Sequence, residues 1–300
     1  MRVRTRAGLA ALVIAVAALA VVGLLVANRG LATDAPLADG DTAGHYRQPE
    51  ALGTRSAEAM KTAVRTGGAP AAAPSPALLG AGATPTAREV PASPAVGPLF
   101  YTGEGTPAHG CTASVVHSRR GDLIVTAAHC VYLGGFRTDL AFVPGYRDGA
   151  APYGVWVPVS VDVAPQWVRG RDPDHDVAFL RVRSVERDEP IERVTGAERI
   201  RFDPQPTRPA RALGYPNTGE RPLACENATD LYSPTQLRFP CTGLPNGTSG
   251  SPILTDVDAA TGLGTVDGVL GGKDEGGDDE TSYSSYFGAP VRALYERATR

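Results

Sequence analysis

The chain has 300 residues and a formal net charge of −3, and 42% of its residues are hydrophobic. Its 7 Phe, 2 Trp and 10 Tyr residues all lie after residue 95, with Tyr46 as the one exception. Residues 96–300 are long enough to bury a sizeable core, and they carry 20 Lys and Arg against 26 Asp and Glu. This mildly acidic balance excludes nucleic-acid binding, which needs a basic face.

The first 30 residues are typical of an export signal. Arg2, Arg4 and Arg6 precede an uncharged, mostly apolar run at residues 7–27, which is the pattern of a signal peptide. At about 1.5 Å per residue in a helix, the run is also long enough to serve as an uncleaved membrane anchor. Both alternatives export the rest of the chain. We therefore expect a secreted protein, or an extracellular one anchored by residues 7–27, with no other membrane contact.

Residues 31–95 contain 18 Ala, 8 Pro and 7 Gly and a single aromatic residue. Such a composition buries too little apolar surface to offset the entropy of ordering the chain. We expect a disordered spacer or propeptide here. The folded domain is then predicted to span residues 96–300, and removal of residues 1–95 should leave it competent.

Short β-rich runs alternate with Gly, Pro and Asp through the rest of the chain. The predicted strands are residues 112–116, 123–126, 155–163, 177–182, 210–215, 253–255 and 266–270. Residues 155–163 are apolar at every odd position, which is typical of a half-buried strand. A helical pattern appears only after Pro290, at Val291, Leu294 and Tyr295. The pattern predicts an all-β sandwich or barrel with one C-terminal helix.

The chain has four cysteines, and in an exported protein an even number predicts disulfides. Three pairings are possible. Pairing of neighbours along the chain gives Cys111–Cys130 and Cys225–Cys241, and loops of that size would each add roughly 3 kcal/mol of stability. No two cysteines lie two to four residues apart, so a zinc site is not predicted.

Three segments carry residues that suit acyl transfer to a serine. Residues 126–130 read TAAHC at the end of a predicted strand, residues 176–180 read DVAFL, and residues 247–252 read GTSGSP. The reaction needs a hydroxyl that attacks, an imidazole that takes its proton and a carboxylate that orients the imidazole. Glycines beside the serine permit a sharp turn whose N–H groups point at a developing oxyanion. The order His, Asp, Ser is one of the known orders of such triads.

These segments resemble the trypsin-like serine proteases of the chymotrypsin fold, and in particular their bacterial secreted branch, over residues 97–300. The resemblance implies two packed six-stranded antiparallel β-barrels with the site between them. It implies His129 as general base, Asp176 as the orienting carboxylate and Ser249 as nucleophile. The N–H groups of Gly247 and Ser249 would form the oxyanion hole.

The resemblance also implies features around this triad. A Cys111–Cys130 bridge matches the family's bridge beside the catalytic histidine. The acid that usually precedes the nucleophile is Thr248 here, so activation through an ion pair with a new N-terminus is not expected. No cofactor or metal is implied.

The substrate pocket is assigned by the same resemblance. In the tryptic members an aspartate lies six residues before the nucleophile, and that offset gives Gly243 here. Leu270, Gly271 and Gly272 would form one wall together with residues 282–286. An uncharged pocket disfavours Arg or Lys, so we expect a medium apolar or small polar substrate side chain. The acidic run at residues 274–280 is expected to be a solvated loop, with substrate recognition or Ca²⁺ binding as alternatives.

Other interpretations compete with the protease. The alternating acids Asp172, Asp174 and Asp176 could hold Ca²⁺, although the run lacks the glycine and distal glutamate of a calcium loop. The chain could be a catalytically inactive relative that acts as a binding protein, but no triad residue is lost. An esterase of another fold would need GxSxG between a strand and a helix. We expect a monomeric serine endopeptidase that acts on proteins or peptides.

Overall fold

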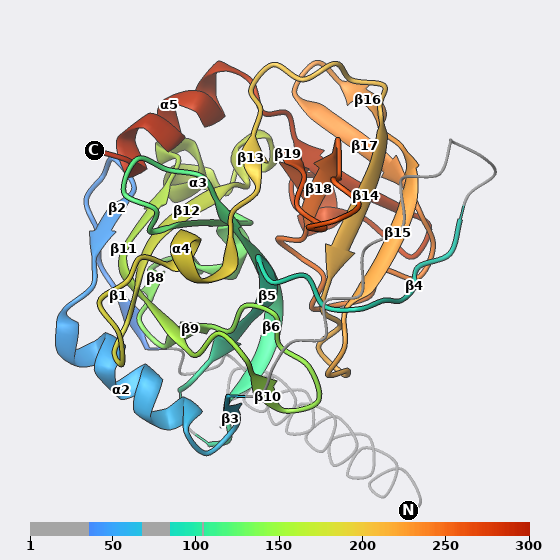
Figure 1. Cartoon of the computed structure of the whole chain (residues 1–300). Coiled ribbons are helices and arrows are strands. Elements are labelled where there is room, and N and C mark those ends of the chain that lie inside the picture. Colours follow the sequence, from blue (N-terminus) through green and yellow to red (C-terminus); the bar gives the residue numbers. More distant parts are fainter. Residues whose placement is uncertain (1–35, 68–84, 104) are drawn as a thin grey trace, which may run out of the picture. The chain divides into compact units, whose positions relative to one another are not determined.

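The computed structural model describes residues 36–67, 85–103 and 105–300 (Figure 1). Seven strands form the first sheet: β2 (His45–Arg47), β5 (Val96–Tyr101), β6 (Ala108–Val116), β7 (Leu123–Thr126), β9 (Leu140–Phe142), β11 (Trp156–Val163) and β12 (Ala178–Ser184). Six of them run in the order β12-β7-β6-β5-β9-β11, and pairing of β11 with β12 closes them into a barrel. The seventh, β2, pairs with β11 from outside.

The second barrel combines a six-stranded and a three-stranded sheet. Their strands are β4 (Arg88–Glu89), β13 (Arg199–Ile200), β14 (Pro209–Gly214), β15 (Leu223–Ala228), β16 (Asp230–Ser233), β17 (Gln236–Pro240), β18 (Pro252–Thr255), β19 (Thr265–Val269) and β20 (Thr281–Ser285). The sheets have the orders β13-β19-β18-β14-β15-β4 and β16-β17-β20. They meet where β17 lies against β15 and β20 lies against β19.

Short elements complete the described chain. Two small strand pairs, β1 (Leu37–Ala38) with β8 (Phe136–Arg137) and β3 (Arg65–Thr66) with β10 (Ala150–Ala151), lie outside these sheets. The helices are α2 (Glu50–Met60), η1 (Ala128–Cys130), α3 (Pro165–Gly170), η2 (Pro173–His175), α4 (Ile191–Thr195), η3 (Lys273–Gly276) and α5 (Ala289–Ala298). No helix among the described residues is long and apolar enough to cross a membrane. The apolar run at residues 7–27 lies outside the described residues.

The predicted all-β fold and C-terminal helix are confirmed. Each of the seven predicted strands falls on an observed one, from β6 to β19. The expectation of a half-buried strand at residues 155–163 is wrong, because every residue of β11 except Val159 is buried. The cause is α2, which packs on the outside of β11 and places the Gly53 backbone against Val157, where an added Cβ would lie 3.0 Å from Cγ2.

The prediction of disorder for residues 31–95 is wrong wherever this segment is described. Residues 36–67 form β1, β2, α2 and β3 on the first barrel, and residues 85–95 run along the second through β4. We call residues 36–67 the N-terminal strap. Its side chains Tyr46, Ala57, Met60 and Val64 are buried. The folded unit therefore includes the strap, and the boundary at residue 96 is incorrect.

Arg297 of α5 anchors the strap from the other end of the chain. Its guanidinium donates hydrogen bonds to the carbonyl oxygens of Ala43 (2.5 Å), Gly44 (3.3 Å) and Val163 (2.7 Å). It also pairs with the buried Asp162 at 2.9 Å. One side chain of α5 thus holds the strap and β11 together.

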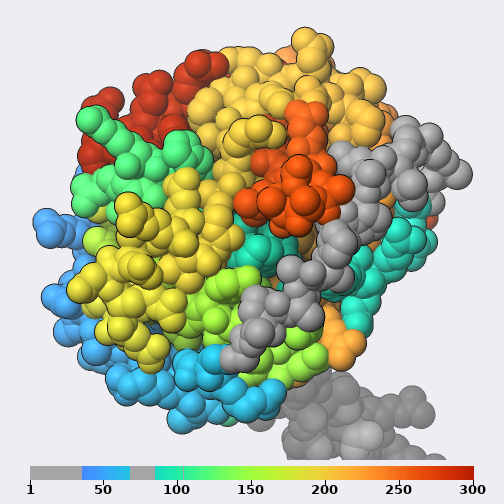
Figure 2. All heavy atoms as spheres, in the orientation of Figure 1, coloured from blue at the N-terminus to red at the C-terminus, as the bar shows by residue number. Residues whose placement is uncertain are grey.

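Residues 185–208 connect the two barrels. Figure 2 shows this connection in yellow, directly beside orange-red residues of the second barrel. The backbone of Glu198 bonds to Val115 and His117 of the first barrel, and the Arg199 N–H donates to Gly264 O of the second at 2.9 Å. The connection is therefore bonded to both barrels.

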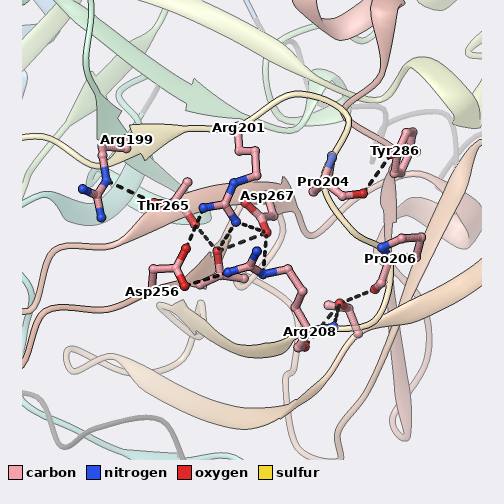
Figure 3. Close-up of polar contacts among 11 residues, drawn as sticks. Arg199, Arg201, Pro204, Pro206, Arg208, Asp256, Thr265, Asp267 and Tyr286 are labelled. Atoms are coloured by element: carbon pink, nitrogen blue, oxygen red, sulfur yellow. Dashed lines mark hydrogen bonds and ion pairs between the residues drawn. The ribbon is translucent and has the colours of Figure 1, made fainter.

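Two arginines fix the end of the connection to the second barrel (Figure 3). Arg201 and Arg208 each approach Asp256 to 2.6 Å. Arg201 also reaches the buried Asp267 of β19 at 3.2 Å. Because two cations share two carboxylates and Asp267 is 3% exposed, this network is screened less than a surface ion pair.

Glu198 is a fully buried carboxyl group on this connection. One side-chain oxygen accepts the Gly264 N–H, and the other has no partner among the described residues. Burial raises the pKa of Glu198 from 4.5 to about 7, although the Gly264 N–H and Arg199 act in the opposite direction. The folded protein therefore holds this proton more tightly than the unfolded chain does.

We expect the stability of the parent protein to depend on pH through Glu198, and the Glu198→Gln variant to lose this dependence. A raised folded-state pKa contributes stability at low pH, and this contribution is lost as pH rises from 4.5 to about 7. The contribution of the Glu198 shift to the free energy of unfolding is about 3 kcal/mol at low pH. Urea unfolding of both proteins at pH 5 and pH 8 measures it. Parallel stability profiles would show that the carboxyl is not titrating in the folded state.

Candidate active site

His129 and Asp176 come from the first barrel and form a bonded pair. His129 lies in η1, directly after β7, and Asp176 lies between η2 and β12. The imidazole Nδ1 is 2.7 Å from Asp176 Oδ2, and the His129 backbone N–H donates to Oδ1 at 2.9 Å. Both carboxylate oxygens are therefore directed to one residue. This fixes Nδ1 as the protonated nitrogen and leaves Nε2 as the basic one.

The end of β19 supplies a further donor to Asp176. The Gly272 N–H donates to Oδ2 at 2.8 Å, and the Asp176 carboxylate is fully buried. A Cβ at Gly271 would lie 2.9 Å from the same oxygen and 3.1 Å from Ala127 Cβ. The absence of a side chain at Gly271 therefore lets the backbone of the second barrel approach the carboxylate closely enough for the Gly272 N–H to bond it.

The electrostatics of the pair make His129 more basic. Burial lowers the pKa of His129, but the charge of Asp176 and its hydrogen bond outweigh burial, so the net pKa lies above the usual 6.5. The charge of Glu275 also raises the pKa of His129, and the charge of Arg171 lowers it. Since a general base must be neutral before it accepts a proton, its function requires a pH above this raised value.

Ser249 belongs to a tight turn of the second barrel directly before β18. Asn246 O accepts the Asn217 N–H at 2.8 Å, and Thr248 O accepts the Ser251 N–H at 3.0 Å. In a trans peptide the N–H points opposite to the carbonyl, so these bonds turn the N–H groups of Gly247 and Ser249 the other way. Neither N–H donates a hydrogen bond to any described residue.

The turn requires glycine at Gly247. Its φ is +99°, and an added Cβ would lie 2.2 Å from Asn217 N, so no other residue fits without moving the backbone. Thr248 is buried and donates from Oγ1 to Pro245 O at 2.7 Å. The turn is thus closed by its own hydrogen bonds, and Thr248 makes no ion pair.

Both disulfides pair neighbours along the chain, as expected. Cys111–Cys130 joins β6 to η1 beside His129, and Cys225–Cys241 joins β15 to the residue after β17. Among the described residues, the single group with metal-ligand geometry is Cys111, His129 and Cys130. The two thiols are oxidised and the imidazole Nδ1 bonds Asp176, so this group does not offer a metal site.

A cavity of about 420 Å³ lies next to Ser249 and His129. It is lined by Gly247, Thr248, Leu244, Pro245, Asn246, Asn217, Leu270, Ser282, Tyr101, Gly110, Cys111 and residues 274–279. Of the pocket residues predicted from sequence, Leu270 lines it, whereas Gly243, Gly271 and Gly272 do not. Gly271 faces Asp176, Gly272 faces the Gln236 amide, and Gly243 faces Thr86 and Ala87.

The acidic run contributes charge to this cavity, which favours the alternative of substrate recognition for residues 274–280 over a purely solvated loop. Asp274, Glu275, Asp278 and Asp279 all line it, and the lining contains neither Lys nor Arg. Asp274 pairs with Lys273, and Glu275 pairs with Arg171. Asp278 and Asp279 form no ion pair with any described residue, and backbone N–H groups of Glu280 and Thr281 lower the pKa of Asp278.

The three acids before β12 do not converge on a common point. Asp172 bonds the Asp174 N–H and His175, Asp174 accepts from Gln236, and Asp176 faces His129. Each carboxylate has its own partner in the protein. The calcium alternative for this run therefore has no support in the structure.

The two barrels are those of the chymotrypsin fold, the fold of the trypsin-like serine endopeptidases. The chain belongs to the family of trypsin-like peptidases, since residues 111–263, just over half of it, match the model of the trypsin-like peptidase domain. A search of curated proteins found no match.

Solved structures share the fold at low sequence identity. Protease Anisep from Arthrobacter nicotinovorans has a TM-score of 0.63 and 24% identity, and the match covers 71% of this chain and 99% of that one. The thermostable serine protease AL20 from an extremophilic microorganism has a TM-score of 0.60 and 24% identity, with coverage of 69% and 97%. A Glu endopeptidase has a TM-score of 0.58 and 17% identity, with coverage of 72% and 98%.

Proposed function

We propose that the protein cleaves peptide bonds through a triad of His129, Asp176 and Ser249 and an acyl-enzyme intermediate. The observation that supports this most is the 2.7 Å contact between His129 Nδ1 and Asp176 Oδ2, together with a cavity that both His129 and Ser249 line. A catalytically inactive binding protein would have no need to keep a buried carboxylate bonded to this histidine.

The geometry supports the usual sequence of steps. Ser249 Oγ attacks the carbonyl carbon while His129 Nε2 takes its proton, and Asp176 stabilises the imidazolium. The oxyanion accepts hydrogen bonds from the N–H groups of Gly247 and Ser249. The C–N bond then breaks as the amine takes the proton from His129. Water then attacks the acyl carbon while the same nitrogen takes its proton. The bond from the acyl carbon to Ser249 Oγ breaks, Oγ receives that proton, and the carboxylic acid leaves.

A fluorophosphonate probe tests this proposal, because it reacts only with a serine that has an activated hydroxyl and an oxyanion hole. We expect labelling of the parent protein and none of Ser249→Ala. Ser251→Ala is the matched control, since Ser251 is buried two residues away and its hydroxyl has no partner among the described residues. A parent protein that resists the probe would favour the inactive binding protein.

We further propose that the protein works as an exported monomer on protein or peptide substrates. Two disulfides suit an oxidising compartment outside the cytosol, and the apolar run at residues 7–27 suits an export signal or anchor. Fractionation of the producing cells, with detection of the chain in medium or membrane, distinguishes the cleaved from the anchored form.

We expect substrates with Arg or Lys at the cleaved bond, in contrast to the uncharged preference inferred from Gly243. Asp278 and Asp279 line the cavity and form no ion pair with a described residue, so an incoming cation would find two carboxylates that it can pair with. Partly exposed pairs contribute about 1 kcal/mol each. Substituting both by Asn should therefore lower kcat/KM for Arg substrates about 10-fold or more.

A positional-scanning peptide library and kinetics on matched Arg and Leu substrates measure this preference. The Leu substrate should be cleaved equally well by the parent and the double variant. Asp188→Asn, an exposed residue outside the cavity lining, is the control for a lost surface charge. Dominant cleavage after apolar residues by the parent protein would contradict the preference for Arg or Lys and support the uncharged pocket inferred from Gly243.

A further inference from the structure

Gln236 lies beside the turn that carries Asp176, although it belongs to the other barrel. It begins β17 and is 3% exposed. Its side-chain Nε2 donates to Pro173 O and to Asp174 Oδ1, both at 2.8 Å. Because both partners only accept hydrogen bonds, the orientation of the amide is fixed by its surroundings. Gln236 thus ties the turn before β12 to the second barrel.

The opposite end of the same amide holds the segment after β19. Gln236 Oε1 accepts the Lys273 N–H at 3.2 Å, one residue after the Gly272 N–H that donates to Asp176. Gly272 has a φ of +82°, and an added Cβ would lie 2.4 Å from Gln236 Oε1. The absence of a side chain at Gly272 therefore makes room for the amide.

Ser285 supports the same turn from the neighbouring strand. It is paired with Gln236 across β17 and β20. Its hydroxyl donates to Pro173 O at 2.9 Å and accepts the Asp176 N–H at 3.0 Å. The second barrel therefore presents two adjacent side chains to one turn of the first, and Pro173 O receives a hydrogen bond from each.

We propose that Gln236 is a positioning residue that holds the Asp176 turn and the Gly272 segment in register with each other. This inference rests on the proposed function, since it concerns how the carboxylate is kept aligned with His129. Without the amide, the turn and the segment lose their shared partner, and the carboxylate loses its fixed position against the imidazole. A displacement of about 1 Å at such a site can lower the rate about 100-fold.

The Gln236→Met variant tests this, because methionine keeps the volume and removes both hydrogen-bonding ends. We expect kcat to fall ~10-fold or more, with little change in KM. The acid limb of the pH–rate profile should also move to lower pH, since a displaced Asp176 raises the pKa of His129 less. Glu275 and Arg171, the other charged groups that act on His129, are unchanged by the substitution.

Gln48→Met is the matched control. Gln48 is 5% exposed, and neither end of its amide has a partner among the described residues. It should leave both kcat and the acid limb as in the parent. If Gln236→Met lowers kcat without moving the acid limb, or if Gln48→Met has the same effects, the positioning role is wrong.

Gln236→Glu keeps the experiment decisive if the methionine variant fails to fold. It retains the shape and the acceptor, but its ionised carboxyl cannot donate and repels Asp174. Its activity relative to the parent should fall as pH rises through the titration of the introduced carboxyl, and a constant ratio near one would overturn the proposal. Fluorophosphonate labelling of the parent distinguishes a failure of the proposed triad from a failure of the positioning role of Gln236. An unlabelled parent refutes the triad, whereas a labelled parent with unaffected Gln236 variants refutes the positioning role alone.

Discussion

Ser249→Ala and His129→Ala are each expected to reduce kcat about 10⁴- to 10⁶-fold, and the double variant to be little worse than either. The reason is that the hydroxyl and the imidazole act in a single proton transfer, so that loss of one partner already abolishes the step. Steady-state kinetics on a peptide substrate, with a Tm for each variant to exclude unfolding, measure the effect. Two modest and additive losses would contradict the triad.

Asp176→Asn extends this test to the third residue. The amide cannot accept from His129 as a carboxylate does, and it favours the wrong tautomer of the imidazole, which costs about 10⁴-fold in a comparable triad. Asp174→Asn is the matched control. Asp174 lies two residues earlier and contacts Gln236 rather than His129, so its loss should affect kcat far less. A reversed order of severity would assign the orienting role to Asp174.

Deletion of the N-terminal strap is expected to abolish the folded state, whereas a chain beginning at Pro36 should keep it. The strap buries Tyr46, Ala57, Met60 and Val64 against the first barrel. Loss of Met60 alone, in Met60→Ala, should cost about 2–5 kcal/mol. Removal of the whole strap also exposes the outer edge of β11, which β2 covers.

Soluble yield and thermal unfolding of the two truncated chains measure this effect, with Met60→Ala as a milder variant in the full chain. Arg55→Ala serves as the control on the same helix, because Arg55 is exposed and its loss should shift stability little. A stable, active chain beginning at Val96 would show that the strap is dispensable, as its composition had indicated.

The sequence predicted the strands of the barrels because they carry a strong local signal, namely runs of β-branched residues between turn formers. The strap lacks such a signal. The buried face of α2 consists of Gly53, Ser56, Ala57 and Met60, which are small or polar apart from the methionine, and the helix has no side-chain cap. These residues are buried because the outer surface of β11 accommodates a small helix face, and that complementarity is a property of the fold rather than of the segment.

The residues of the candidate site also fall into two groups, those that a sequence motif indicates and those that only the fold brings to the site. His129, Asp176 and Ser249 lie in short motifs whose backbone requirements restrict the neighbouring residues, so the sequence alone makes them candidates. Gln236 and Ser285 are common residue types with no motif around them, and only the pairing of β17 with β20 brings them to the Asp176 turn. Residues 274–279 line the cavity beside Ser249, and a fixed offset from the nucleophile does not indicate that they lie there.

The contacts of Arg297 have a consequence for the order in which the chain folds. This residue bonds Ala43, 254 positions earlier, so the first and last parts of the described chain meet only after everything between them has been synthesised. Contacts of such long range are slow to form, because the intervening loop must first be closed. The strap is therefore expected to dock late. Until it does, Met60 and the edge of β11 stay exposed, and during that interval the chain is most prone to aggregate.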